Sequence, residues 1–580
     1  MSSLDNLHTS RDSPLAQKII TQQPSPYHLR QENSTQHSTL QSPVSGSLIF
    51  PISAIFLTQF NVKSGYELKW HKTIDESVNI SGLEYKSLPS GLHEVEQDVV
   101  SFVQPKTNAE GTTETSYDLY YGISVYHQNL KESNNKDRSS VKMFSLGILV
   151  DPLRLTSMQT LSQKTNDDFS IWKPLHFTST LQYVDKLKDL LMDWDMNSFT
   201  EFELFFDDYK RNDLLEAPII NSPRFKRTDV FPLMDNDTRR IVANPQKNGN
   251  HHYLLKLPKL LERLGPLTFR VWREALLRKR ILLLDSSNVD LNDSFVYCLS
   301  IISTLPQDSI SILTESGCEE IAKLRYIQPF YTVGVNDLEW FKLIKNKNLG
   351  YITFSTDEIL LYKDSIYDYS ISFKSDSATN NTPPRLLTSD ASKVGAKETA
   401  PLRSTQRDLK RTQFLTKELG LYNNDKVSTD GNDHDDDNVQ QWWRQVSDPV
   451  SWRQLIWTNF YWWASAGDKL IKGEETEGLD EIGIDDRDEV EKALFIVGYF
   501  QSMTKKLFQS TANIIINHDA SIRNEGESLA NNVITIEPIE VLELGLDPYS
   551  QDDANFLIQL IDFYWKREAK ISSALNICCH

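Results

Sequence analysis

The chain has 580 residues, 39% of them hydrophobic, and its 80 acidic and 61 basic residues give a formal net charge of −19. This length allows roughly two to four compact units, each with its own core. The acidic excess argues against nucleic acid and against an anionic bilayer as partners, because both require a concentrated basic surface. The four cysteines are too few for a disulfide framework, and none belongs to a metal-type C-x-x-C pair.

The amino-terminal segment, residues 1–46, is predicted to be a disordered tail. It is rich in Ser, Thr, Gln, Pro and Asn, and such a composition buries too little apolar surface to offset the entropy of ordering. Its first residues, MSSLDNLHTSRDSPLAQ, lack the apolar core of a signal peptide. No run in the chain approaches the roughly 20 apolar residues that cross a bilayer. We therefore expect a cytoplasmic protein whose membrane contacts are peripheral.

A first ordered unit is predicted over residues 47–195, as a sheet followed by a helix. In YELKWHK the apolar residues alternate with polar ones, which is the period of a half-buried strand. In LQYVDKLKDLLMDW (181–194) the apolar residues share one face of a helix. This order of elements indicates a small α/β unit. The predicted strands are 48–60, 66–72, 118–127 and 141–150.

A second unit is predicted over residues 236–366, where helices and strands alternate. Two helices lead into the short apolar strand ILLLD (281–285), and a helix with apolar residues at helical spacing follows it. Further strands are expected over 327–334 and 350–362. Alternation of this kind is typical of a mainly parallel sheet with helices on its faces.

Two polar stretches interrupt the second half of the chain. Residues 374–404 are rich in Ser, Thr, Asn, Lys and Pro, and residues 424–438 are acidic and rich in Asn. Both are predicted to be disordered insertions. The segment between them, RTQFLTKELG (411–420), is predicted to be a helix that docks on the fold.

The region 439–570 is predicted to be helical, and residues 571–580 form a tail with two cysteines. Six of the twelve tryptophans fall between Trp442 and Trp463. Their helical spacing favours core filling over a stacking platform for bases. The predicted helices are 452–466, 489–508 and 550–567, and in the last of these Ser550 and Asp553 have the spacing of a capping box.

The segment HEVEQ (93–97) resembles the start of a zinc-protease site. Two histidines one helical turn apart are needed there, so that both imidazoles face one metal ion. Position 97 is Gln97, and the following VVSFV is a β-prone run rather than a helix. The metal interpretation therefore fails.

Other chemical motifs do not assign a site. No segment matches the G-x-S-x-G elbow, the G-x-x-x-x-G-K-[ST] phosphate loop, the G-x-G-x-x-G fingerprint or the kinase motif set. Asp435, Asp436 and Asp437 lack the EF-hand ligand order, which favours a solvated acidic loop. His251 and His252 have no partner at ligand spacing and are predicted to be surface histidines. We assign no catalytic, cofactor-binding or metal-binding residue and expect no cofactor.

Cys578 and Cys579 are the remaining candidates for a modification. Adjacent thiols near a chain end are accessible, and two acyl chains would supply the two signals that stable membrane anchoring requires. The ending ICCH is not a C-a-a-X box, so a plain reduced tail is the alternative interpretation.

Three segments resemble the markers of DENN-domain proteins. LPSGLHEVEQDVVSFV (88–103) is similar to the marker of the first lobe, in which a Pro-Gly turn and a His precede an Asp-led strand. In the second unit, Phe269, Trp272 and Leu276 match F-x-x-W-x-x-x-L, and Arg280 leads into the strand. Residues 544–567 resemble the end of the helical region. The chain is most similar to the group that contains LCHN and the Avl-nine-related proteins.

The resemblance implies an α/β fold: a DENN module with a longin-like first lobe, a central α/β lobe and a mostly helical carboxyl-terminal part. It implies a regulator of vesicle-mediated transport that acts as a guanine nucleotide exchange factor for a small GTPase of the Rab or Arf family. The expected location is cytoplasmic and peripheral on Golgi or secretory membranes. No covalent chemistry and no individual GTPase-interface residue are implied.

Two alternatives to exchange activity stay open at this point. A trafficking scaffold or GTPase effector that keeps the DENN fold would have the same sequence features. A metal- or nucleophile-dependent hydrolase has the least support, because the motifs that such chemistry requires were not found in the sequence.

Overall fold

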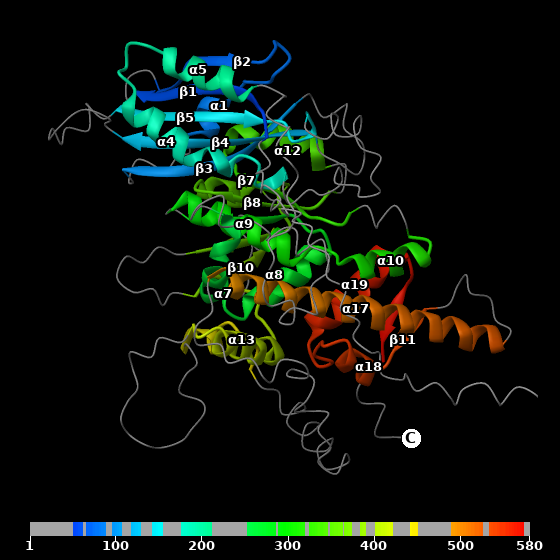
Figure 1. Ribbon diagram of the computed structural model, residues 1–580. Helices are drawn as coiled ribbons and strands as arrows, with labels where there is room; N and C mark the ends of the chain where they lie inside the picture. Colours follow the sequence, from blue (N-terminus) through cyan, green and yellow to red (C-terminus); the bar gives the residue numbers. More distant parts are fainter. Residues whose placement is uncertain are drawn as a thin grey trace, which may run out of the picture. The chain divides into compact units, whose positions relative to one another are not determined.

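The computed structural model (Figure 1) describes most of the two predicted units and parts of the helical region. The described residues are 50–61, 65–88, 96–106, 118–128, 142–154, 176–210, 252–285, 288–318, 324–345, 349–363, 365–373, 383–389, 401–421, 441–449, 489–525 and 533–572. The tail 1–46, the insertion 424–438, the tryptophan-rich helix 452–466 and Cys578 and Cys579 lie outside them.

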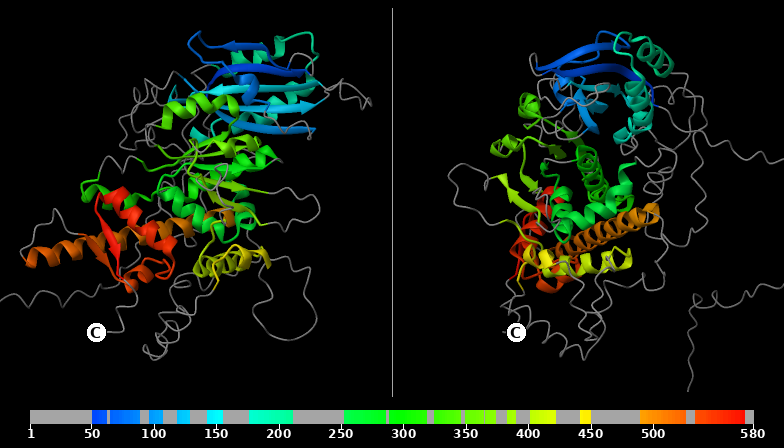
Figure 2. Two further views of the ribbon diagram at one scale, coloured as in Figure 1. Left: turned by 180° about the vertical axis from the view of Figure 1, so that it is seen from behind. Right: turned by 90° about the vertical axis from the view of Figure 1, so that its left-hand side faces the viewer.

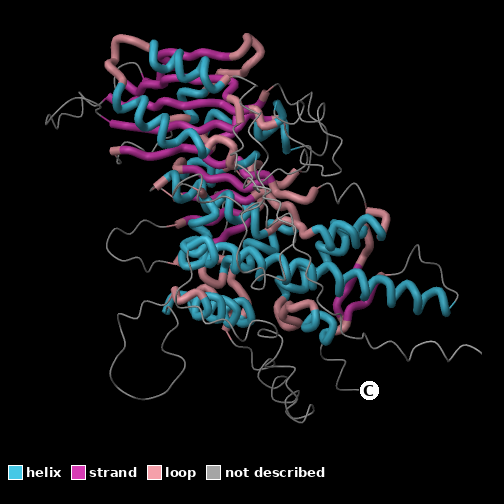
Figure 3. Tube along the Cα trace, in the orientation of Figure 1, coloured by secondary structure: helices cyan, strands magenta, loops and turns pink. Residues whose placement is uncertain are grey.

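Among the described residues, ten strands form one continuous sheet that runs through both predicted units (Figures 1 and 3). The strands of the two predicted units join because β3 pairs with β7, which satisfies backbone groups at the edge of each part. Across the sheet the strands are β10 (Arg385–Thr388), β9 (Tyr369–Ser372), β6 (Ile281–Leu284), β8 (Tyr351–Ser355), β7 (Gln328–Thr332), β3 (Gln97–Pro105), β4 (Leu119–Gln128), β5 (Lys142–Val150), β1 (Ile52–Asn61) and β2 (Gly65–Thr73).

The first lobe, the described part of residues 50–210, contains the antiparallel strands β1 to β5. Helices α4 (Val184–Asp193) and α5 (Thr200–Tyr209) cover one face of these strands (Figures 1 and 2). Each helix buries an apolar stripe at helical spacing, for example Phe202, Phe205 and Phe206 of α5. The short helix α1 (Leu83–Lys86) contacts β1 and β2. The predicted strands and the predicted helix of this lobe are confirmed, while α5 lies beyond the predicted boundary at residue 195.

The second lobe, the described part of residues 252–389, contains the parallel strands β6, β7, β8 and β9. The predicted parallel sheet with helices is therefore confirmed, and β10 adds an antiparallel edge. The strand expected over 350–362 ends at Ser355, and its second half is wrong because Glu358–Tyr362 form a 3-10 turn. The main helices of this lobe are α7 (Leu257–Leu264), α8 (Leu267–Leu276), α9 (Val289–Ile302), α10 (Gln307–Glu315) and α12 (Leu338–Lys345), with 3-10 turns η8 (Tyr253–Lys256), η9 (Val335–Asp337) and η10 (Glu358–Tyr362).

The prediction of a disordered insertion over 374–404 is wrong for residues 383–389 and for residues 401–404, where Leu402 donates its backbone N–H to Leu386 and Ser404 is buried. These residues include β10, which pairs with β9 and buries Leu386 against the core. One buried side chain in a segment rich in Thr, Pro and Asn gives too weak a pattern to detect. The helical prediction for 439–570 needs a smaller correction, since β11 (Ile534–Ile536) pairs in parallel with β12 (Ala569–Ile571).

The carboxyl-terminal elements pack on the second lobe through helices. They are α13 (Gln406–Glu418), α14 (Gln441–Gln445), α17 (Glu489–Glu525), α18 (Pro538–Glu543) and α19 (Gln551–Trp565). The α17 ring of Phe500 lies 5.1 Å from the Phe269 ring and 5.8 Å from the Trp272 ring of α8. These two residues of the F-x-x-W-x-x-x-L motif therefore hold α17 in place by burying aromatic surface.

A buried ion cluster ties α8 to α13 and α19. The guanidinium of Arg273 donates two hydrogen bonds to the carboxylate of Asp408, at 3.0 and 2.6 Å, and its Nε lies 3.3 Å from Asp553. Asp553 also accepts the backbone N–H of Asp547, while the Ser550 hydroxyl accepts the N–H of Asp553. Only one half of the predicted capping box is present, because the Asp553 carboxylate is used elsewhere.

Candidate functional site at the lobe junction

The two lobes meet where β3 runs beside β7, and a single register pair, Phe102 with Tyr331, joins them. Both side chains are buried, and the Tyr331 hydroxyl donates to the carbonyl of Phe177 at 2.6 Å. Tyr331 has a φ of 59°, in the left-handed region, which costs a residue with a β-carbon roughly 1–2 kcal/mol. Because the junction holds this strained backbone, it is a defined contact rather than a loose one.

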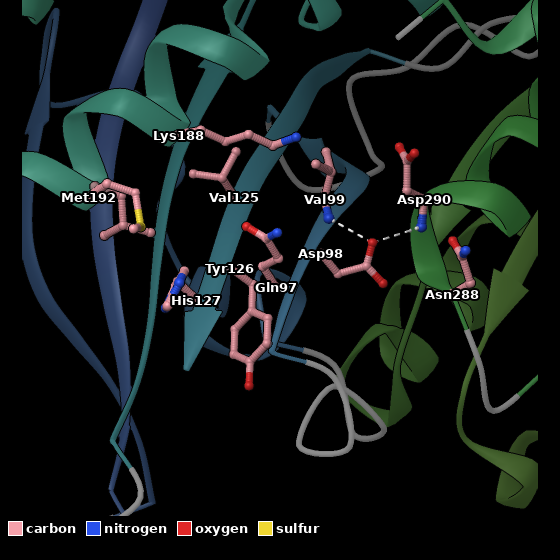
Figure 4. Close-up of a pocket in the computed structure, with 11 residues that line it drawn as sticks. Gln97, Asp98, Val99, Val125, Tyr126, His127, Lys188, Met192, Asn288 and Asp290 are labelled. Carbon is pink, nitrogen blue, oxygen red and sulfur yellow. Dashed lines mark hydrogen bonds between the residues drawn. The ribbon is translucent and has the colours of Figure 1, made fainter. Parts of the chain in front are cut away.

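Asp98 of the first lobe caps helix α9 of the second lobe (Figure 4). Its carboxylate accepts the backbone N–H groups of Val289 at 3.0 Å and Asp290 at 3.4 Å, and also that of Val99 at 2.8 Å. The side chain of Asn288 accepts the next free amide of α9. A carboxylate at a helix amino terminus is stabilised both by these hydrogen bonds and by the helix dipole. Burial nevertheless raises the pKa of Asp98, and the hydrogen bonds only partly offset this.

A second carboxylate crosses the junction in the opposite direction. Asp293 of α9 accepts the backbone N–H of Ser101 at 2.8 Å and the hydroxyl of Thr332 at 2.9 Å. Its side chain is fully buried, and no basic side chain among the described residues forms an ion pair with it. Burial raises the pKa of Asp293 well above its usual value, with smaller contributions from Asp290 and Asp98. The junction therefore contains a desolvated carboxyl group that is held by hydrogen bonds alone.

A buried ion pair provides a third connection between the lobes. The ammonium of Lys86, at the end of α1, lies 2.8 Å from the carboxylate of Asp337 and donates to the carbonyl of Val103 at 2.7 Å. The two charged side chains are only 8% and 4% exposed. The same ammonium lies 5.9 Å from the ring centre of Trp340, which is within the range of a cation–π contact.

A pocket of about 260 Å³ opens beside the Asp98 cap, and both lobes line it (Figure 4). The first lobe supplies apolar walls from β3, β4 and α4, and the amino terminus of α9 supplies polar groups. The hydroxyl of Tyr126 is buried here without a hydrogen-bond partner among the described residues. The lining residues are Gln97, Asp98, Val99, Val125, Tyr126, His127, Lys188, Leu191, Met192, Asn288 and Asp290.

The chemistry of this site is suited to binding. Apolar side chains such as Val99, Val125 and Met192 lie in the pocket wall beside polar and charged groups. Within the described part of the chain, no group of His, Cys, Asp and Glu side chains has the arrangement of a metal site. What the junction offers is shape, apolar surface and fixed charge at the meeting point of two lobes.

The structure places several residues that the sequence singled out. In HEVEQ, residues 93–95 lie outside the described residues, while Gln97 begins β3 and lines the pocket. Leu276 of the α8 motif is buried, and Arg280 pairs with Asp368 at 2.6 Å at the start of β6.

The prediction that His252 is a surface histidine is wrong. His252 is 5% exposed, and its Nδ1 accepts the backbone N–H of Leu254 at 3.2 Å, which caps η8. Burial lowers the pKa of His252 to about 4, so the ring is neutral near pH 7. The hydrophilic surroundings in the sequence gave no sign of this cap. His251 lies outside the described residues.

Sequence reasoning did not assign roles to Asp98, Asp293 or the Lys86–Asp337 pair. The only available signal was the aspartate that opens the strand in the DENN-like marker.

Among the described residues, no single helix is long and apolar enough to cross a membrane. Helices α9 and α10 together pass that test of length and composition, with a bend of 47° between them.

Comparison with known proteins identifies the family. The family model of DENN domain-containing protein 11 matches residues 55–383, and that of a domain of unknown function, DUF4484, matches residues 447–580. The chain is 28% identical to the uncharacterized protein ANR2 of Saccharomyces cerevisiae, over 90% of this chain and 93% of that protein. It is 23% identical to the uncharacterized protein C119.16c of Schizosaccharomyces pombe, over 59% of this chain and 68% of that protein.

A vertebrate relative is more distant. The chain is 21% identical to DENN domain-containing protein 11 of Danio rerio, over 55% of this chain and 53% of that protein. The family match spans both lobes and the junction between them, and DENN domains are generally linked to Rab GTPases and membrane trafficking. Because one family model covers more than half of its length, the chain belongs to the family of DENN domain-containing protein 11.

Proposed function

We propose that this protein is a guanine nucleotide exchange factor for a small GTPase of the Rab type. The observation that carries the proposal is the DENN family match over residues 55–383, which includes the first lobe, the second lobe and their junction. Within the family we place the chain in the group that contains LCHN and the Avl-nine-related proteins. Its expected site of action is cytoplasmic and peripheral on Golgi or secretory membranes.

Nucleotide exchange requires no nucleophile or general base from this chain. An exchange factor binds the nucleotide-free state of its GTPase more tightly than the GDP-bound state, and by linkage it weakens GDP binding by the same factor. A binding surface of fixed shape favours tight binding, because free energy spent on ordering a surface is lost from affinity.

The lobe junction supports such a mechanism. Asp98 holds α9, Asp293 holds β3, and the buried pair of Lys86 and Asp337 joins α1 to the segment before α12. Hydrogen bonds and ion pairs in a region without water hold their partners in one arrangement, and they therefore fix the two lobes relative to each other. A GTPase that contacts both lobes would thus meet one preformed surface.

A panel of Rab and Arf GTPases loaded with fluorescent GDP tests the proposal. We expect the full chain to accelerate GDP release from at least one member, as a loss of fluorescence that depends on protein concentration. Binding to a GTPase without acceleration would instead support a scaffold or effector. A hydrolase would require turnover of a substrate or a metal that co-purifies in stoichiometric amount.

A further inference from the structure

The outer face of the first lobe is formed by α4 and α5, which lie side by side over the sheet (Figures 1 and 2). The ammonium of Lys186 on α4 donates to the hydroxyl of Tyr209 on α5 and lies 4.3 Å from the centre of that ring. Trp194, at the end of α4, packs against Phe202 of α5. The exposed sides of the two helices therefore form one surface, here called the α4–α5 face.

This face carries an excess of negative charge. Residues 184–210 contain eight acidic side chains and three lysines. Five of the exposed carboxylates form no ion pair with any residue that the structure describes. They are Asp189, Asp193, Glu201, Glu203 and Asp208.

Part of this charge stands where helix formation disfavours it. Asp185, Asp189 and Asp193 follow one another at a spacing of four residues, so like charges lie together on one helix surface. Asp193 and Asp208 lie in the last turns of α4 and α5, where the helix dipole disfavours negative charge and where neither helix has a basic residue. Helix stability therefore does not account for Asp193 and Asp208, whereas Glu201 and Glu203 lie in the first turn of α5, where the helix dipole favours them.

Two large apolar side chains are exposed on the negatively charged α4–α5 face. Met192 of α4 is 49% exposed and Leu204 of α5 is 60% exposed. Met192 also lines the junction pocket, so the face continues into a cavity of about 260 Å³ with Val125 and Leu191 in its wall (Figure 4). Exposed apolar groups rimmed by charge are a common feature of protein-binding surfaces.

We propose that the α4–α5 face docks a basic segment of a partner protein. Lysine or arginine side chains of that segment would neutralise the five carboxylates, and an apolar side chain would pack on Met192 and enter the junction pocket. An anionic membrane or a nucleic acid would be repelled by the same charge, which leaves a cationic polypeptide as the complementary occupant. The proposal goes beyond exchange activity and does not depend on it.

The test uses the full chain and a labelled model peptide of alternating lysine and tryptophan, followed by fluorescence anisotropy. Two further peptides, lysine–serine and glutamate–tryptophan, separate the contributions of charge and apolar contact. The docking variant combines D189K, D193K and E203K. The matched control combines E315K, E543K and D562K, which change the net charge equally at exposed sites on α10, α18 and α19.

We expect the lysine–tryptophan peptide to bind about tenfold more weakly to the docking variant than to the wild type. Binding to the control variant should be nearly unchanged, binding should weaken as salt is raised, and the glutamate–tryptophan peptide should not bind. The proposal is overturned if both variants lose affinity equally, since net charge alone would then explain binding. It is also overturned if the lysine–serine peptide binds as tightly as the lysine–tryptophan peptide.

Discussion

The carboxylate of Asp98 in β3 accepts the first backbone amide of α9, that of Val289, at 3.0 Å. Asp98 and α9 belong to different lobes, so this hydrogen bond is at once a helix cap and a contact between lobes. It explains in physical terms why an aspartate opens the strand in the DENN-like marker. The Asp98 carboxylate also occupies the amino terminus of α9, where free anions could otherwise bind.

Replacing Asp98 with alanine should destabilise the protein by roughly 0.5–2 kcal/mol, the usual effect of removing a helix cap. The D98N variant should lose less, because its single amide oxygen can still accept one of the two α9 amides that the two carboxylate oxygens accept now. Denaturant unfolding followed by tryptophan fluorescence measures both. The D189A variant, at an exposed carboxylate of α4 without an ion pair among the described residues, is the control. Equal midpoints for D98A and D189A would contradict the assigned role.

Replacing Lys86 with methionine should cost about 3–5 kcal/mol, because the carboxylate of Asp337 would remain buried without its partner. The double variant K86M/D337N should recover part of that loss, since its asparagine is uncharged and still accepts the N–H of Gly334, as Asp337 does now. A double-mutant cycle by denaturant unfolding gives the coupling between the two residues. Additive single effects would show that the pair contributes nothing across the junction.

The buried cluster at Arg273 should make stability depend on pH. Asp408 takes the guanidinium in a two-point contact, and burial raises the pKa of Asp553 from 3.8 to about 6. A carboxyl group whose pKa is higher in the folded protein than in the unfolded chain binds its proton more tightly in the folded protein. Its contribution to stability is therefore present below about pH 4 and is lost as the pH rises to about 6.

The D553N variant cannot titrate and should lack this contribution. Between pH 4 and pH 6.5, the wild type should lose roughly 2–3 kcal/mol of stability relative to D553N. Denaturant midpoints of the two proteins, measured at several pH values in this range, give the difference directly. A constant difference across the range would mean that Asp553 keeps its ordinary pKa.

The two carboxyl-terminal cysteines supply a cell-level prediction. If Cys578 and Cys579 carry acyl chains, replacing both with serine should move the membrane-bound pool to the soluble fraction after ultracentrifugation. The C318S variant, which removes a partly exposed thiol in the second lobe, is the control. An unchanged distribution in the double variant would favour the plain reduced tail.

Much of the fold follows from sequence periodicity. Strands β1, β4 and β5 are long and apolar, and α4 and α19 have clear helical stripes. Parallel pairing of β6 with β8 follows from the helices that separate the strands. Helix α5 was missed although Phe202, Phe205 and Phe206 have helical spacing, because it is short and follows the predicted end of the first unit.

The functional site was much harder to predict. Asp98 contacts α9, and Lys86 contacts Asp337, across very large sequence separations. Composition and spacing describe local structure, whereas these contacts depend on which edges of two lobes meet. The left-handed backbone of Tyr331 coincides with an irregularity in the pairing of β7 with β8, and an isolated tyrosine disfavours this conformation.

Release of fluorescent GDP from a panel of Rab and Arf GTPases is the measurement that tests the proposed activity most directly. The full chain should accelerate release from at least one GTPase, and K86M, assayed at a temperature where it remains folded, should accelerate it less. The E315A variant, at an exposed carboxylate of α10 outside both the junction pocket and the α4–α5 face, serves as the folded control. No acceleration for any member of the panel, with the protein folded and binding a GTPase, would contradict exchange activity and favour a scaffold.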